Sequence, residues 1–223
     1  NKRVFSMTSF PSSSATAGYR LILGTYGGGV LATGDAGASF YAINGLTCNF
    51  VRTVRAISTS ATTMRLLAGT DCGGATSGVH YQDLSPTSSI WTKATGMPDG
   101  IRVFTIAPVG ATSSYNTPLM AGTSNGIYKS SDNGQTWTAV SASPTGTNGS
   151  KAVYGVTYFS SSLPLFATVE SGGIYVSKDG GNTWTASNTG LPTTAPLVPS
   201  SGFVGTTDSG NTLYSAFDGQ GVY

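Results

Sequence analysis

Short hydrophobic runs separated by turns rich in Gly, Ser and Asn extend along the whole chain. One run, Leu-Met-Ala-Gly-Thr-Ser-Asn-Gly-Ile-Tyr at 119–128, recurs with variations beginning at residues 21, 66, 165 and 213. Successive copies are 45, 53, 46 and 48 residues apart. Runs this short, bounded by turn residues, predict antiparallel strands, and repeats of about 40–50 residues are typical of the blades of a β-propeller.

Each repeat also contains an earlier strand-forming run, at 3–7, 53–57, 102–106 and 152–156. The fifth copy of this run, near 197–204, is interrupted by Pro199. We call the earlier run strand A, the Leu-x-Ala-Gly-Thr run strand B and the Gly-Ile-Tyr run strand C, with a strand D to follow. Stacking such sheets around an axis would bury both faces of each sheet. We expect the core between them to include Phe5, Ile57, Phe104, Val153 and Leu213.

The sequence therefore predicts an all-β fold: a five-bladed β-propeller of four-stranded antiparallel blades, forming one domain over residues 1–223. The repeats run approximately over 1–48, 49–98, 99–148, 149–193 and 194–223. In this count the last blade lacks its outer strand. That blade is three-stranded, is completed by another protein chain, or belongs to a truncated sequence.

A second repeated pattern places an aspartate before a Gly and an aromatic residue. The pattern is Ser130-x-Asp132-x-Gly134-x-Thr136-Trp137, and it occurs again at 177–184. A less exact copy lies at 33–40, and a copy lengthened by an insertion lies around Asp83 and Trp91. This pattern resembles the Asp box, or BNR repeat, of sialidase-type and xyloglucanase-type β-propellers. Aspartate can accept hydrogen bonds from the N–H groups of its own turn, and tryptophan can fill the space between blades. We therefore interpret these residues as structural: Asp35, Asp132, Trp137, Asp179 and Trp184.

The first residue of the turn between strands B and C varies from copy to copy. It is Tyr26, Asp71, Ser124, Glu170 and Asp218, so three of the five are acidic. In a propeller these turns and the D–A connections share one end of the ring, and the turns with the repeated aspartates lie at the other. Clustered carboxylates there could accept sugar hydroxyls or hold a cation; the alternative is ordinary solvated turn residues. Four tyrosines are candidates for stacking on sugars: Tyr26, Tyr81, Tyr115 and Tyr158.

The two cysteines, Cys48 and Cys72, fall at the same predicted end of adjacent blades. A disulfide between them is sterically reasonable and would suit an extracellular protein, while two free thiols are the alternative. No C-x-x-C motif is present, and we assign no metal site.

The composition and the missing motifs exclude several classes of function. Only 9% of residues are charged, and the 11 basic residues are scattered, which excludes an electrostatic case for nucleic acid. No apolar stretch reaches the roughly 20 residues of a membrane helix. His80 is the single histidine and no G-x-S-x-G elbow occurs, so we nominate no catalytic residue and no cofactor. The resemblance to sialidases implies an arginine triad, but Arg3, Arg55 and Arg102 are out of phase with one another.

The sequence favours a secreted, lectin-like propeller that binds glycans or polysaccharide without catalysis at the B–C and D–A turns. One alternative is a protein-binding scaffold. The other is a glycoside hydrolase that would use Asp71, Glu170 and Asp218 around the central funnel.

Overall fold

The computed structural model describes residues 3–12, 15–16, 18–84, 90–109, 115–141, 151–158, 164–191, 216–217 and 221–222. It contains four four-stranded antiparallel sheets, one for each of the first four repeats. We call them blades 1 to 4. Blade 1 holds β1 (Arg3–Pro11), β2 (Tyr19–Tyr26), β3 (Gly29–Thr33) and β4 (Tyr41–Ile43); blade 2 holds β5 (Val51–Ser58), β6 (Met64–Thr70), β7 (Gly78–Leu84) and β8 (Thr92–Lys93). Blade 3 holds β9 (Val103–Pro108), β10 (Leu119–Thr123), β11 (Gly126–Ser130) and β12 (Thr138–Ala139); blade 4 holds β13 (Val153–Thr157), β14 (Leu165–Val169), β15 (Gly173–Ser177) and β16 (Thr185–Ala186).

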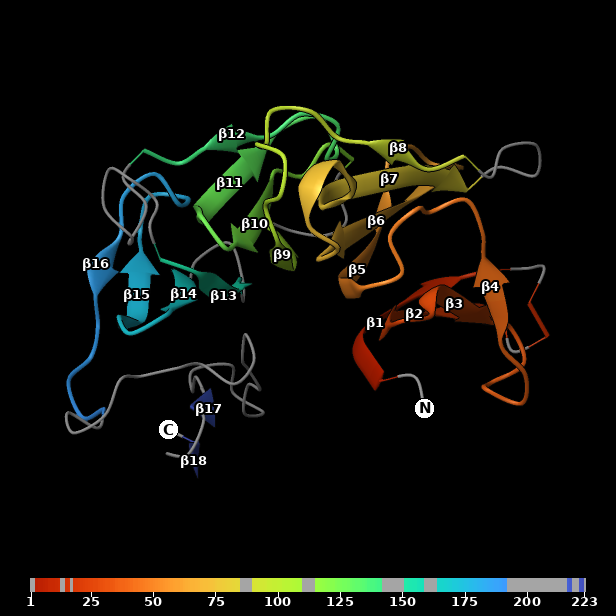
Figure 1. Cartoon of the computed structure of the whole chain (residues 1–223), viewed down its shortest axis with the longest axis horizontal. Coiled ribbons are helices and arrows are strands. Elements are labelled where there is room, and N and C mark those ends of the chain that lie inside the picture. The colour runs from red at the N-terminus through yellow and green to blue at the C-terminus, as the bar shows by residue number, and fades with distance from the viewer. Residues whose placement is uncertain are drawn as a thin grey trace.

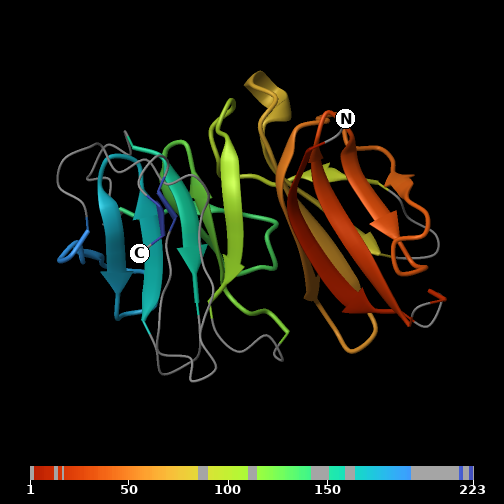
Figure 2. The same cartoon turned by 90° about the horizontal axis from the view of Figure 1, so that it is seen from below.

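The four blades follow one another around an arc, with β1, β5, β9 and β13 on its inner side (Figure 1). Of the fifth repeat, the structure describes only a hairpin of β17 (Ala216–Phe217) and β18 (Gly221–Val222). The predicted four-stranded antiparallel blades are thus confirmed, whereas the predicted number of five is not shown. Figure 2 shows the strands side by side, with the 3-10 turn η1 (Gly74–Thr76) projecting at one end. We call this end, which carries the B–C turns, the rim.

The repeated glycine of strand B lies where the next blade's inner strand comes closest. A Cβ added to Gly69 would lie 2.7 Å from Cγ1 of Val103, and one added to Gly122 only 2.5 Å from the carbonyl oxygen of Val153. Both valines are fully buried. Blade 4 has Thr168 at this position. The Ala-Gly-Thr repeat therefore reflects close packing of neighbouring blades rather than a turn.

Tryptophans fill the outer part of the same interfaces. Trp137 is 2% exposed and packs with Leu67 of blade 2 and Leu119 of blade 3. Trp91 and Trp184 occupy the interfaces of blades 1–2 and 3–4. Phe40 takes the same sequence position in blade 1 but is 50% exposed. Each indole thus packs toward the preceding blade, and blade 1 has no described blade in that direction.

The turn between the third and fourth strands is organised by a carboxylate. Asp132 Oδ1 accepts hydrogen bonds from the Ser130 hydroxyl at 2.8 Å and from the Thr136 N–H at 2.9 Å. Its Oδ2 accepts the Thr136 hydroxyl at 2.6 Å. Asp35 and Asp179 make the equivalent bonds in blades 1 and 4. We call these three the Asp turns.

Hydrogen bonds to the ionised carboxylates lower their pKa values. The Thr183 hydroxyl is the largest cause in Asp179, whose pKa falls to about 2, and the Ser39 hydroxyl is the largest cause in Asp35, whose pKa lies well below its usual range. Partial burial acts to raise the pKa of Asp132, but the bonds from Thr136 and its neighbours outweigh it. The hydrogen bonds of the Asp turns therefore favour ionised aspartate.

Blade 2 departs from this pattern. Asp83 lies within β7 and pairs with Arg65, whose Nε and Nη2 are 2.6 and 2.9 Å from its two oxygens. Arg65 Nη1 donates to the carbonyl of Asn133 in the next blade. In blade 2 the aspartate of the repeat therefore belongs to an ion pair, and the arginine of that pair links two blades.

Some of the predicted core residues are buried in the structure and others are not. Val153 is fully buried, and Ile57 packs partly buried against the core between blades 2 and 3. Phe5 is 41% exposed and Phe104 is only partly buried, so the expectation that they belong to the core is corrected. Both lie at the rim ends of inner strands. Leu213 lies outside the described residues.

His80 is 5% exposed in β7, and its Nδ1 has no hydrogen-bond partner among the described residues. Burial, assisted by the positive charge of Lys93, lowers the pKa of His80 from 6.5 to about 4. The unfolded chain therefore binds a proton at a higher pH than the native state does. Stability contributed by neutral His80 is present above pH 6.5 and is lost as the pH falls toward 4.

We expect the free energy of unfolding to fall when the pH is lowered from about 7 to about 4.5. The fall should be about 2 kcal/mol larger for the native protein than for the His80→Gln variant, because glutamine does not titrate. Urea unfolding of both proteins at the two pH values measures this difference. Equal losses in the two proteins would contradict a neutral buried imidazole.

Candidate ligand-binding rim

The first residues of the B–C turns occupy equivalent places at the rim. The N–H groups of Asp71, Ser124 and Glu170 donate to carbonyls that immediately precede the inner strand of their own blade, at 3.0, 2.9 and 2.8 Å. Tyr26 forms a bridge with Phe50 beside them. The structure thus brings four of the predicted site residues to one end of the arc, and Asp218 lies outside the described residues.

A β-bulge interrupts each inner strand near its start at the rim. The register shifts between Val4 and Ser6 in β1, and the same shift recurs in β5, β9 and β13. A bulge leaves one residue without a partner and redirects its side chain. The four bulged residues are Phe5, Arg52, Phe104 and Tyr154. All four are large side chains with a planar group.

These four side chains form a continuous row across the blades, which we call the bulge row. The Arg52 guanidinium lies 4.8 Å from the ring centroid of Phe5 and 5.9 Å from that of Phe104. The rings of Phe104 and Tyr154 are 4.8 Å apart and inclined by 34°. Cation–π and offset aromatic contacts of this kind are favourable. The row holds a fixed, partly exposed π surface along the inner edge of the rim.

Charged groups line the bulge row. Arg52 Nε and Nη2 donate to Asp71 Oδ2 at 3.0 and 2.8 Å, and Arg102 Nε lies 4.0 Å from Oδ1. The Asp71 side chain is 15% exposed, while that of Arg102 is 52% exposed. Both oxygens of Asp71 therefore face arginine, and the half-exposed guanidinium of Arg102 lies 5.7 Å from the ring centroid of Phe104.

The acidic end of the row lies in blade 4. Glu170 Oε2 accepts a 3.4 Å hydrogen bond from the N–H of Ala152. Burial, and next the negative charge of Glu170, raise the pKa of Tyr154, while Arg102 and Arg52 act in the opposite direction. The rim is therefore one electrostatic unit that extends over three blades.

Comparison with known proteins identifies the fold. Neither a protein-family model nor a curated protein matches the sequence. Solved structures do match. The extracellular domain of a one-component system from B. thetaiotaomicron has a TM-score of 0.65 at 13% identity, covering 98% of this chain and 26% of its own. A GH74 enzyme of Niastella koreensis gives 0.62 at 20% identity, covering 98% and 33%, and YCF48 bound to D1 peptide gives 0.58 at 17%, covering 91% and 58%.

The chain has a β-propeller fold. At these identities the likeness concerns the fold alone. The chain spans between about a quarter and three fifths of the length of the three structures.

The other predicted aromatic residues of the propeller are not all at the rim. Tyr26 is 49% exposed there and packs against Phe50, with ring centroids 4.4 Å apart. Tyr81 lies against the core of blades 2 and 3 beneath Arg65, and Tyr158 packs in the interface of blades 3 and 4. Tyr115, 48% exposed, precedes β10 at the opposite end.

The predicted disulfide between Cys48 and Cys72 is confirmed, with an S–S distance of 2.06 Å. It joins the connection that leads into β5 to the B–C turn that begins at Asp71, and so fixes the rim beside the Arg52–Asp71 pair. Within the described part of the propeller, no three His, Cys, Asp or Glu side chains gather where a metal ion could be held. No described helix is long and apolar enough to cross a membrane.

The bulge row is not among the sites predicted above, although the repeats contain a signal for it. In each of the first four repeats, a valine is followed directly by the bulged residue: Val4-Phe5, Val51-Arg52, Val103-Phe104 and Val153-Tyr154. This valine is buried in blades 2 to 4, whereas Val4 is 48% exposed. Aligning the repeats on these pairs, rather than on the arginines, would have identified the row.

Proposed function

We propose that this protein is a secreted propeller that binds a glycan or polysaccharide at the rim without catalysis. The bulge row is the observation that carries the proposal. Sugar rings present faces of C–H groups that pack on the negative faces of aromatic rings, and their hydroxyls donate to carboxylates. Phe104 and Tyr154 offer such faces, with Glu170 and Arg102 beside them. The disulfide also suits an extracellular protein.

A glycoside hydrolase is the second candidate, because Asp71 and Glu170 share the rim and GH74 enzymes share the fold. An inverting hydrolase needs one carboxyl group as a proton donor and another as a base. Both oxygens of Asp71 face arginine, since Oδ2 accepts two hydrogen bonds from Arg52 and Oδ1 lies 4.0 Å from Arg102, so this carboxylate is engaged by the protein itself rather than free to meet a substrate. A protein-binding scaffold is the third candidate, since YCF48 with the same fold binds a peptide.

The binding proposal predicts that Phe104→Ala weakens affinity for an oligosaccharide found on a glycan array by about tenfold, because a stacked ring contributes on the order of 1 kcal/mol. Tyr115→Ala, which removes an exposed ring at the end opposite the rim, should leave affinity unchanged. Isothermal titration measures both. No binding on a broad array would contradict the proposal, and reducing sugar released by the native protein but not by Glu170→Gln would establish the hydrolase.

We also propose that the aspartate repeats are true Asp boxes and that residues 194–223 supply a fifth blade. The free face of blade 1 supports the fifth blade. Ser6 and Thr8 form hydrogen bonds with β5 of blade 2, so the intervening Met7 points to the opposite face, where it is 66% exposed. Phe40 lies half-exposed in the position of the inter-blade tryptophan. A further blade against this face would bury both.

This closure predicts that a thiol at Met7→Cys is alkylated at least about tenfold more slowly than one at Thr62→Cys in an exposed turn. Both natural cysteines are held in the disulfide, so each variant has a single free thiol. Protection should not depend on protein concentration. Equal rates at the two sites, or protection that disappears on dilution, would contradict closure by the chain itself.

A further inference from the structure

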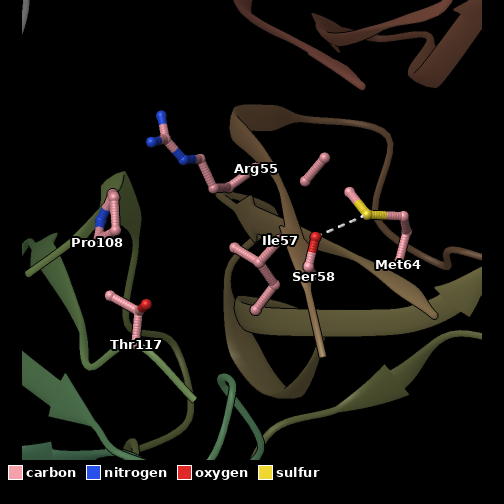
Figure 3. Close-up of a pocket in the computed structure, with 7 residues that line it drawn as sticks. Arg55, Ile57, Ser58, Met64, Pro108 and Thr117 are labelled. Carbon is pink, nitrogen blue, oxygen red and sulfur yellow. Dashed lines mark hydrogen bonds between the residues drawn. The ribbon is translucent and has the colours of Figure 1, made fainter. Parts of the chain in front are cut away.

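A pocket lies between blades 2 and 3 at the end opposite the rim. It is lined by Arg55, Ile57 and Ser58 of β5, by Met64 of β6 and by Pro108 at the end of β9. Figure 3 shows the Arg55 guanidinium extending away from Ile57 and Met64, with Ser58 facing Met64. One wall is therefore apolar, and a cation stands at its edge.

Arg55 differs from the other two arginines of blade 2 in having no counterion among the described residues. Arg52 pairs with Asp71, and Arg65 pairs with Asp83. Among the described residues Arg55 has no hydrogen bond, ion pair or ring contact, although its side chain is partly buried. The only acidic residues outside the description are Asp208 and Asp218.

A guanidinium that is partly removed from water without a partner loses solvation that nothing replaces. Burial accordingly lowers the pKa of Arg55, yet an arginine in a protein stays charged. A bound carboxylate would replace the lost solvation of the guanidinium, because its two oxygens can accept hydrogen bonds from two parallel N–H donors of the arginine.

The neighbouring groups indicate what else the ligand contains. The Ser58 hydroxyl donates to Met64 Sδ at 3.2 Å, and a thioether is a weak acceptor that a carboxylate oxygen can displace. Ile57, Met64 and Pro108 present hydrocarbon to the same space. Packing a short aliphatic chain against these groups would remove apolar surface from water, which is favourable.

We propose that this pocket binds a small aliphatic monocarboxylate, with Arg55 holding the carboxylate and Ile57, Met64 and Pro108 covering the hydrocarbon. Inorganic oxyanions share the charge but not the chain, so the apolar wall favours the carboxylic acid over them. This site is separate from the rim and does not depend on what the rim binds.

Methionine methyl NMR with hexanoate as the probe tests the assignment. The chain has four methionines, and only Met64 lines the pocket. Its methyl signal should shift saturably with hexanoate, while Met7 on the free face of blade 1 stays unmoved. Hexanamide, which has the same shape without the charge, should shift nothing.

Arg55→Gln should weaken the hexanoate affinity by about tenfold or more, because it removes a charge-assisted pair of hydrogen bonds. Lys178→Gln, which removes an exposed cation elsewhere, is the matched control and should bind as the native protein does. An unchanged signal from the buried Met120 shows that a variant is folded. If Arg55→Gln is unfolded, Arg55→Lys replaces it, and weaker binding is again expected because the fork is lost.

Three results would overturn the proposal: no shift of Met64 with hexanoate, the same affinity in the folded Arg55 variant, or an equal shift with sodium sulfate. The last would show a general anion site with no role for the apolar wall.

Discussion

A blade of this protein can bury its two faces only against its neighbours, and the remaining features follow from that constraint. The inner strands approach so closely that strand B keeps a glycine where the next blade's valine arrives, as at Gly69 and Gly122. Farther from the axis the gap widens, and an indole such as Trp137 fills it. Small residues near the axis and large ones farther out set the wedge shape that produces the arc.

The same constraint creates the rim. Strands stacked around an axis all begin at one end, so any feature near the start of one inner strand is repeated beside its neighbour. The inner strand is also the edge of its sheet, and its free backbone groups need partners. In β5 two of them, the N–H groups of Val54 and Ala56, bond the hydroxyls of Ser6 and Thr8 from β1. The bulges that end this pairing turn large side chains toward the axis and bring them into contact.

Much of the architecture could be predicted from sequence because it is encoded by local, repeated chemistry. The repeat predicted four-stranded blades, the aspartate pattern predicted self-bonded turns, and the cysteine positions predicted the disulfide. The bulges were not predicted because a register shift depends on pairing between strands. Phe5 and Phe104 were assigned to the core on hydrophobicity alone, although the bulge exposes them at the rim. Arg55 lacks a counterion because the fold brings no described carboxylate near it. No sequence motif predicts this spatial arrangement.

The central claim is that the bulge row forms a ligand surface rather than a structural seam. A crystal of the protein soaked with mixed monosaccharides tests it most directly, since it shows both whether a sugar binds and where. The account predicts a sugar ring stacked on Phe104 and Tyr154, with hydroxyls directed to Glu170 or Arg102. Sugar density found only at the opposite end of the propeller, with the bulge row empty, would contradict it.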